Sequence, residues 1–129
     1  MQIDVDFPGG LAVNASFGDF TVKTDQAKAV GGGGTAPSPF ELFLSSIAAC
    51  AGYYALAFCR EREISTQGMK LSASFEKSPE TKTLATADLT LTLPTGFPEK
   101  YVKPIIRTME QCTVKRAIAA QPLFTINVS

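Results

Sequence analysis

Histidine is absent from this chain of 129 residues, and cysteine occurs only three times. The chain therefore lacks the commonest zinc ligand and the usual general base beside a nucleophile, so we expect no metal site. An excess of charge of one sign is missing too, because twelve basic side chains balance twelve acidic ones. No block of Lys or Arg occurs. We therefore expect neither nucleic acid nor an anionic membrane as a partner.

Signals for export and for a disulfide framework are also lacking. Asp4 and Asp6 lie where a signal peptide would carry positive charge followed by an apolar core. An odd number of cysteines without such a signal argues against structural disulfides. The sequence therefore predicts a cytoplasmic protein.

Apolar residues are plentiful, at 45% of the chain against 19% charged residues. This balance is typical of an ordered protein that hides apolar surface in an oligomer. The apolar stretch from Phe40 to Cys59 is long enough to be mistaken for a membrane span. Glu41, Ser45 and Ser46 within it, and strand-like patterns on both sides, favour a buried central helix instead.

Alternation of apolar and polar residues predicts strands, and apolar residues at helical spacing predict helices. The predicted order is βββ-α-ββ-α-α-β, which is the α+β class with mostly antiparallel sheet. The length suits a single domain over residues 1–129. The strands are expected at 3–7, 11–17, 20–24, 69–75, 85–93 and 123–128, and the helices at 39–63, at 98–109 and after Cys112.

The start of the long helix carries the clearest local signal in the chain. Ser38 suits the N-cap, Pro39 the first helical position and Glu41 the third, which together form a capping box. In a straight helix Glu41 lies half a turn away from Cys50, so capping explains it without catalysis. A kink, or placement by a partner subunit, would leave a catalytic role for Glu41 open.

Four consecutive glycines precede this helix, at positions 31 to 34. Such a run could cradle an anion at a helix start. No Gly-Lys-Ser/Thr follows it, and the carboxylate of Glu41 falls in the first helical turn. The sequence therefore favours a mobile loop over the thiol site rather than a phosphate site.

Cys50 lies in the middle of the most apolar stretch, flanked by alanines and glycine. A reactive cysteine must be a thiolate, whereas apolar burial raises its pKa. Candidates to stabilise a thiolate are Arg107, Lys115 and Arg116, together with the hydroxyls of Tyr53 and Tyr54 one helical turn further along. The alternative is that Cys50 is an ordinary buried small residue.

The other two cysteines differ in their surroundings. Cys112 would have backbone N–H groups and the positive dipole end facing it if it starts a short helix, with Lys115 and Arg116 one turn on. Otherwise it continues the apolar stripe of the preceding helix. Cys59 lies half a turn from Cys50 on the opposite helix face, so a packing role is expected for it.

Two segments together resemble a known family. Residues 37–50 read PSPFELFLSSIAAC and residues 110–114 read EQCTV. This pairing resembles the osmotically inducible protein C and organic hydroperoxide resistance (OsmC/Ohr) family, and the order of elements fits over nearly the whole chain. The resemblance implies an intertwined homodimer with the long helix at its centre and two thiol sites at the subunit interface. It implies that Cys50 attacks a peroxide, that Cys112 resolves it, and that an external dithiol reductant rather than a bound cofactor resets the pair.

Two positions differ from the pattern of the hydroperoxide-resistance members. Those members place a glutamate ten residues before the first cysteine, where this chain has Phe40, and Glu41 comes one residue later. They also use an arginine from the N-terminal strand region, whereas the first arginine here is Arg60. The spacing resembles the OsmC-like branch of the family.

The leading hypothesis is a thiol-dependent peroxidase that reduces organic hydroperoxides through Cys50 and Cys112. The second hypothesis is a non-catalytic dimer that binds a small apolar ligand around Phe43, Tyr53 and Tyr54. An acyl-handling enzyme such as a thioesterase ranks last, because no histidine is present to serve as a general base.

Overall fold

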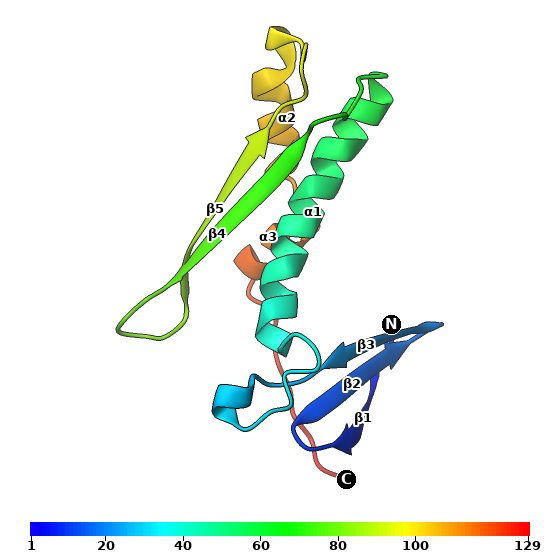
Figure 1. The fold of residues 1–129 in the computed structure, drawn as a ribbon, viewed down its shortest axis with the longest axis vertical. Coiled ribbons are helices and arrows are strands. Elements are labelled where there is room, and N and C mark those ends of the chain that lie inside the picture. The colour runs from blue at the N-terminus through cyan, green and yellow to red at the C-terminus, as the bar shows by residue number, and fades with distance from the viewer. The chain divides into compact units, whose positions relative to one another are not determined.

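The computed structural model describes all residues from 1 to 129 and divides them into two compact units, residues 1–45 and residues 46–129. The helix α1 (Pro39–Glu61) runs from the first unit into the second. The elements follow the predicted α+β order up to the last helix, with antiparallel sheets (Figure 1). The single domain expected over residues 1–129 stays a prediction.

The first unit contains a three-stranded antiparallel meander. Its strands are β1 (Asp4–Gly9), β2 (Ala12–Phe17) and β3 (Phe20–Thr24), with β2 in the middle. Phe17 pairs with Phe20 across a two-residue loop, and Gly18 adopts a φ of 54° that suits glycine. The predicted hairpin at this position is confirmed.

The glycine-rich loop after β3 folds around one carboxylate. Asp25, only 3% exposed, accepts hydrogen bonds from the N–H of Gln26 (2.7 Å) and from the N–H and Oγ1 of Thr35 (3.1 and 2.7 Å). A short 3-10 helix, η1 (Lys28–Val30), lies within the loop. The carboxylate therefore ties together the two ends of a segment that the sequence had suggested to be a mobile loop.

The long helix α1 begins as the capping box predicts. The N–H of Glu41 donates to Oγ of Ser38 at 3.2 Å, and the N–H of Ser38 donates to Oε2 of Glu41 at 2.8 Å. The helix ends at Glu61, two residues before the predicted end, and the N–H of Ile64 then closes back on the carbonyl of Cys59. Glu63 turns the chain with a φ of 54°.

In the second unit a β-hairpin lies alongside α1. Figure 1 shows this hairpin in green and yellow-green. Its strands are β4 (Lys70–Lys77) and β5 (Leu84–Thr92). Leu71 pairs with Leu91 and Ala73 pairs with Leu89, so these apolar residues share one face. Leu71 lies in van der Waals reach of Gly52 on α1. The alternating pattern therefore predicted the hairpin, and Leu71, Ala73, Leu89 and Leu91 are half-buried in it.

Three short helical segments follow: η2 (Glu99–Tyr101), α2 (Val102–Met109) and α3 (Thr113–Ala119). Pro104 lies in the first turn of α2, where its missing N–H costs no helical bond. The hydrophobic core is formed by Ala55, Phe58 and Cys59 of α1 with Ile105 of α2.

Two expectations need correction. Residues 120–129 form no strand, although 123–128 alternate as a strand does, because a strand needs a hydrogen-bonded neighbour and this segment has none within the chain. The central helix is not buried all round. Its buried residues form one stripe, Ile47, Ala51, Ala55, Phe58 and Cys59, and the rest is partly or fully exposed in the single chain.

The length and composition of α1 would also allow it to cross a membrane, but the core helix of a soluble protein passes the same test. Only 28% of its most apolar window is buried within the chain. The feature to explain is therefore what covers the remaining faces of this helix.

Candidate functional site

The structure brings Cys50 and Cys112 together, although they are far apart in the sequence. Cys50 projects from α1 and is half-buried, and Cys112 is the N-cap residue of α3 with 2% of its surface exposed. Both thiols are free, and the S–H of Cys112 donates a hydrogen bond to the sulfur of Cys50. The two thiols are therefore neighbours without a covalent bond.

The acidity of Cys50 is set by its neighbours at the start of α3. Burial raises the pKa of the Cys50 thiol, but hydrogen bonds from the N–H of Val114, the S–H of Cys112 and the N–H of Thr113 outweigh it. The net effect is a pKa below the ordinary cysteine value. Hydrogen bonds of this kind favour the thiolate, which is the nucleophilic form.

The pKa of Cys112 moves in the opposite direction. Burial raises it most, and donation to Cys50 together with the charge of Cys50 raises it further, against smaller opposing bonds from the N–H groups of Lys115 and Val114. The pair therefore combines a more acidic thiol at Cys50 with a less acidic thiol at Cys112. A thiolate with an adjacent proton-bearing thiol suits attack by one sulfur and later condensation by the other.

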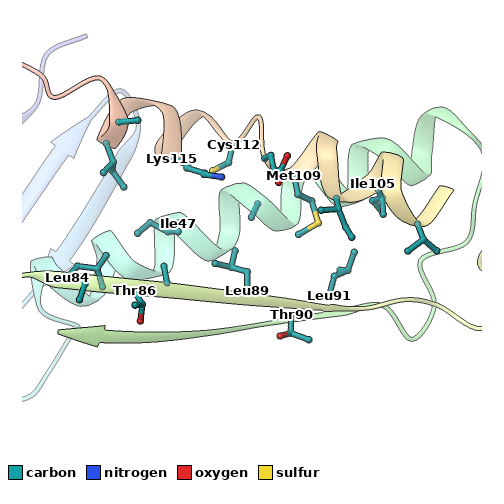
Figure 2. A pocket seen from close by; sticks show the side chains of 18 of the residues that line it. Ile47, Leu84, Thr86, Leu89, Thr90, Leu91, Ile105, Met109, Cys112 and Lys115 are labelled. Atoms are coloured by element: carbon teal, nitrogen blue, oxygen red, sulfur yellow. The ribbon is translucent and has the colours of Figure 1, made fainter. Parts of the chain in front are cut away.

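An apolar groove of about 770 Å³ lies in the second unit (Figure 2). Figure 2 shows Cys112, Lys115 and Met109 on one side of it and Leu89 and Leu91 of β5 on the other. A groove of this size can hold a drug-sized organic ligand. Its walls come from α1, from β5 with the residue just after it, from α2, and from α3 with the turn before it. In that order the lining residues are Ile47 and Ala51; residues 84–87, 89–91 and Leu93; Val102, Ile105, Ile106 and Met109; and Glu110, Cys112, Lys115, Ile118 and Ala119.

Cys112 therefore belongs to two environments at once. Its sulfur lies against Cys50, and the residue also forms part of the groove wall, whereas Cys50 is not among the lining residues. Ile47 and Ala51 flank Cys50 in α1 and do line the groove. The groove and the thiol pair are thus adjacent, and Cys112 is the residue that belongs to both.

The two arginines proposed to stabilise the thiolate are exposed side chains. Arg107 lies near the end of α2 and Arg116 in α3. Neither is among the groups that shift the pKa of Cys50. Backbone N–H groups at the start of α3 supply the stabilisation within one chain, and a role for the arginines stays a prediction.

Glu41 and Phe43 lie in the first turns of α1. Glu41 uses its carboxylate to accept the N–H of Ser38, as its capping role requires. The ring of Phe43 stacks on that of Phe40 with centroids 5.8 Å apart. Neither residue lines the groove, and their predicted catalytic and ligand-binding roles stay predictions.

The two tyrosines have different surroundings. Their rings meet edge to face with centroids 5.5 Å apart. Tyr53 is 63% exposed, whereas the hydroxyl of Tyr54 is hydrogen bonded to Oγ1 of Thr113 at 3.0 Å. Neither tyrosine lines the groove, so a ligand site around them also stays a prediction.

Sequence reasoning missed the residues that touch Cys50 from α3. Thr113 and Val114 act through their backbone N–H groups, which any residue but proline has, so their side chains give no signal. The signal that was available is the position of Cys112 at a helix start, where free N–H groups gather. For the β5 residues that line the groove, the sequence predicted a strand but not a groove wall.

Cys59 stays apart from this pair. It is fully buried in the core beside Phe58 and Ile105, and burial raises its pKa, with a smaller opposing effect from Arg62. No group of three or more His, Cys, Asp or Glu side chains in residues 1–129 could hold a metal ion. Cys59 is therefore a packing residue, as the helix spacing predicted.

Solved structures of several proteins have a similar fold. One, from Psychrobacter arcticus 273-4, is described as an osmotic stress induced and detoxification response protein, with 21% identity, a TM-score of 0.77, and coverage of 91% of this chain and 87% of that one. An OsmC like protein from Mycoplasma pneumoniae has 15% identity and a TM-score of 0.68, covering 94% and 89%. An organic hydroperoxide resistance protein OsmC from Legionella pneumophila has 22% identity and a TM-score of 0.53, covering 92% and 89%.

At these identities the structural likeness establishes the fold alone. No curated protein matches the chain by sequence. The sequence model of the OsmC-like protein family, however, matches residues 31–127, which contain Cys50, Cys112 and the second unit as far as residue 127. The chain belongs to the OsmC-like protein family.

Proposed function

We propose that this protein is a thiol-dependent peroxidase that reduces organic hydroperoxides, with Cys50 as nucleophile and Cys112 as resolving thiol. The observation that carries the proposal is the hydrogen-bonded pair of Cys50 and Cys112, in which the pKa of Cys50 is lowered and that of Cys112 is raised. Membership of the OsmC-like family and the similarity to organic hydroperoxide resistance proteins support it. The adjacent apolar groove suits the organic part of such a substrate.

The cycle has three steps. The Cys50 thiolate attacks one oxygen of the hydroperoxide and breaks the O–O bond, which leaves a sulfenic acid on Cys50 and an alkoxide that takes a proton from solvent. The Cys112 sulfur then attacks the sulfenic sulfur, a disulfide forms, and water leaves. An external dithiol finally reduces the disulfide and is itself oxidised, which restores both thiols. Such a cycle suits the cytoplasm, where dithiol reductants are available.

The proximity of the two thiols favours a resolving step that needs little movement. A disulfide needs its two Cα atoms about 4.4–6.8 Å apart and its sulfurs able to approach one another. Hydrogen bonding already holds the sulfurs side by side in the reduced protein. We therefore expect condensation to need little rearrangement of α1 or α3.

The test follows consumption of tert-butyl hydroperoxide with dithiothreitol as reductant. Wild type should turn over, Cys50→Ser should fall to the rate of buffer alone, and Cys112→Ser should accumulate a sulfenic acid on Cys50 that dimedone traps. Cys59→Ala removes the third thiol and should keep the wild-type rate. Equal rates in wild type and Cys50→Ser, or no turnover in either, would overturn the proposal.

The second candidate is a non-catalytic ligand-binding protein, favoured by the apolar groove of about 770 Å³. The same Cys50→Ser variant separates the two functions, because Cys50 is not among the groove-lining residues. Binding of the neutral fluorophore N-phenyl-1-naphthylamine should be unchanged in Cys50→Ser and weakened by Ile118→Lys in the groove. A large loss of affinity in Cys50→Ser would count against this candidate.

We also propose that the protein is a homodimer. The exposed apolar side chains of the first unit include Phe7 and Phe20, at 80% and 68% exposure. In the second unit the C-terminal segment exposes Leu123, Phe124, Ile126 and Val128. Uncovered apolar surface on this scale marks an interaction site. The incompletely covered α1 adds to it, and two copies would bury these surfaces against each other.

A further inference from the structure

One hydrogen bond joins the two elements that carry the thiols. The hydroxyl of Tyr54 on α1 lies 3.0 Å from Oγ1 of Thr113 on α3. Tyr54 comes four residues after Cys50, so both project from the same side of α1, one turn apart. Thr113 directly follows Cys112. The contact therefore bridges the thiol pair from the next turn of the helix.

Thr113 is also one of the residues that touch Cys50. Its backbone N–H, with that of Val114, donates to the Cys50 sulfur. One residue thus carries two contacts to α1, through its N–H to Cys50 and through its hydroxyl to Tyr54. Moving Thr113 away from Tyr54 would therefore also change its distance to the sulfur.

Side-chain burial does little to fix α3 in place. The helix has only seven residues, none of them is buried, and the residues that follow it form no regular structure. A short helix of this kind is marginal in water without external contacts. Specific bonds to α1 therefore have a large share in holding its first turn against Cys50.

We propose that Tyr54 is a positioning residue, whose hydroxyl holds Thr113 so that the first N–H groups of α3 stay directed at the Cys50 sulfur. In this arrangement Tyr54 does not touch the reacting atoms, and it acts through Thr113. The catalytic consequence rests on the peroxidase function proposed above. The effect on thiol acidity does not, and it can be measured without any peroxide.

The experiment measures the alkylation of Cys50 by iodoacetamide across pH, with the Cys50 peptide followed by mass spectrometry. In Tyr54→Phe the profile should move to higher pH, and the rate at pH 7 should fall about fivefold, the order that one hydrogen bond controls. The plateau rate at high pH, where the thiol is fully ionised, should stay unchanged. A general loss of structure would alter the plateau instead.

Matched variants isolate the hydroxyl pair. Thr113→Val should reproduce the shifted profile, whereas Thr113→Ser keeps the hydroxyl and should keep the wild-type profile. The profile of the double variant Tyr54→Phe/Thr113→Val should shift no further than that of either single variant. Tyr53→Phe removes the neighbouring, exposed hydroxyl, which is not among the groups that act on Cys50 in the structure, and it should leave the profile in place.

A Tyr54→Phe profile that superimposes on wild type, or an equal shift in Tyr53→Phe, would overturn the positioning role. If Tyr54→Phe fails to fold, the Thr113→Val and Thr113→Ser pair decides alone. A shifted profile in a protein that consumes no hydroperoxide would keep the positioning role and remove the peroxidase. Turnover of hydroperoxide by wild type, together with an unshifted alkylation profile in Tyr54→Phe, would keep the peroxidase and remove the positioning role.

Discussion

The sulfur of Cys50 and the carboxylate of Asp25 share one physical feature. Each accepts backbone N–H hydrogen bonds, from Val114 and Thr113 in one case and from Gln26 and Thr35 in the other. No arginine or lysine is among the groups that lower either pKa. Fixed backbone donors can therefore take the place of a cationic side chain, which accounts for a lowered Cys50 pKa without the N-terminal arginine of the hydroperoxide-resistance pattern.

Asp25 gives a prediction for acid stability. Hydrogen bonds from the side chain and the N–H of Thr35, then from Gln26, lower its pKa from 3.8 to about 2. A carboxylate with a depressed folded-state pKa stabilises the protein above its unfolded-state pKa, and this stabilisation is lost as pH falls from about 3.8 to about 2.

Urea midpoints between pH 5 and pH 2 measure this contribution. Asp25→Asn should be less stable than wild type at pH 5, and the difference should shrink as the pH approaches 2. Exposed Asp88 on β5 serves as a control, since Asp88→Asn should keep the wild-type slope. A constant gap between wild type and Asp25→Asn across this range would contradict the assignment.

At the scale of elements, close backbone approach shapes the glycine-rich loop. A Cβ at Gly32 would collide with the carbonyl of Gln26, and one at Gly33 would lie 2.9 Å from Oδ2 of Asp25. Gly52 in α1 is different, because a Cβ there would meet only Cδ2 of Leu71, at an ordinary 3.7 Å. Glycine is therefore required in the loop and dispensable in the helix.

These two positions predict changes of opposite sign in the free energy of unfolding. Gly32→Ala should destabilise the protein by about 1–3 kcal/mol, because the backbone must shift to make room. Gly52→Ala should stabilise it by about 0.5–1 kcal/mol, because alanine is the better helix former. Urea titrations of both variants against wild type test the pair, and a stabilised Gly32→Ala would refute the close approach.

Local patterns predicted the elements well, and contacts between distant segments account for the rest. The capping box of Ser38 and Glu41 is read within four residues, so the start of α1 was predicted correctly. The prediction of a final strand at 123–128 was wrong for the single chain. Alternation of apolar and polar residues shows that a segment could form a strand, but it does not show whether another strand is there to pair with it. The partners of Cys50 on α3 are backbone groups and leave no trace in residue identity.

At the scale of the whole molecule, the chain on its own leaves much apolar surface in water. The C-terminal segment is almost fully exposed, with Ile126 at 92% and Val128 at 97%. Only part of α1 is covered by its own chain. Association with a second copy is the simplest arrangement that would bury both, and it is the homodimer proposed above.

Removal of residues 123–129 tests this association. The truncated chain should lose apolar contact area and should dissociate at concentrations where the full chain is a dimer, as measured by sedimentation equilibrium. A full-length double variant, Phe124→Asp/Ile126→Asp, should dissociate likewise. Thr125→Asp, on the opposite side of the alternating segment, should remain a dimer. A monomeric full chain would remove the homodimer.

The exposed C-terminal segment also affects how new chains reach their final state. Phe124, Ile126 and Val128 alternate as strand residues do, but no strand of the same chain pairs with them. During synthesis such a segment can add to any open sheet edge it encounters, so correct assembly competes with aggregation. Concentrated refolding mixtures should therefore benefit from a chaperone. Once the segment is covered in the proposed homodimer, thermal midpoints should rise with protein concentration, because association stabilises the folded chains.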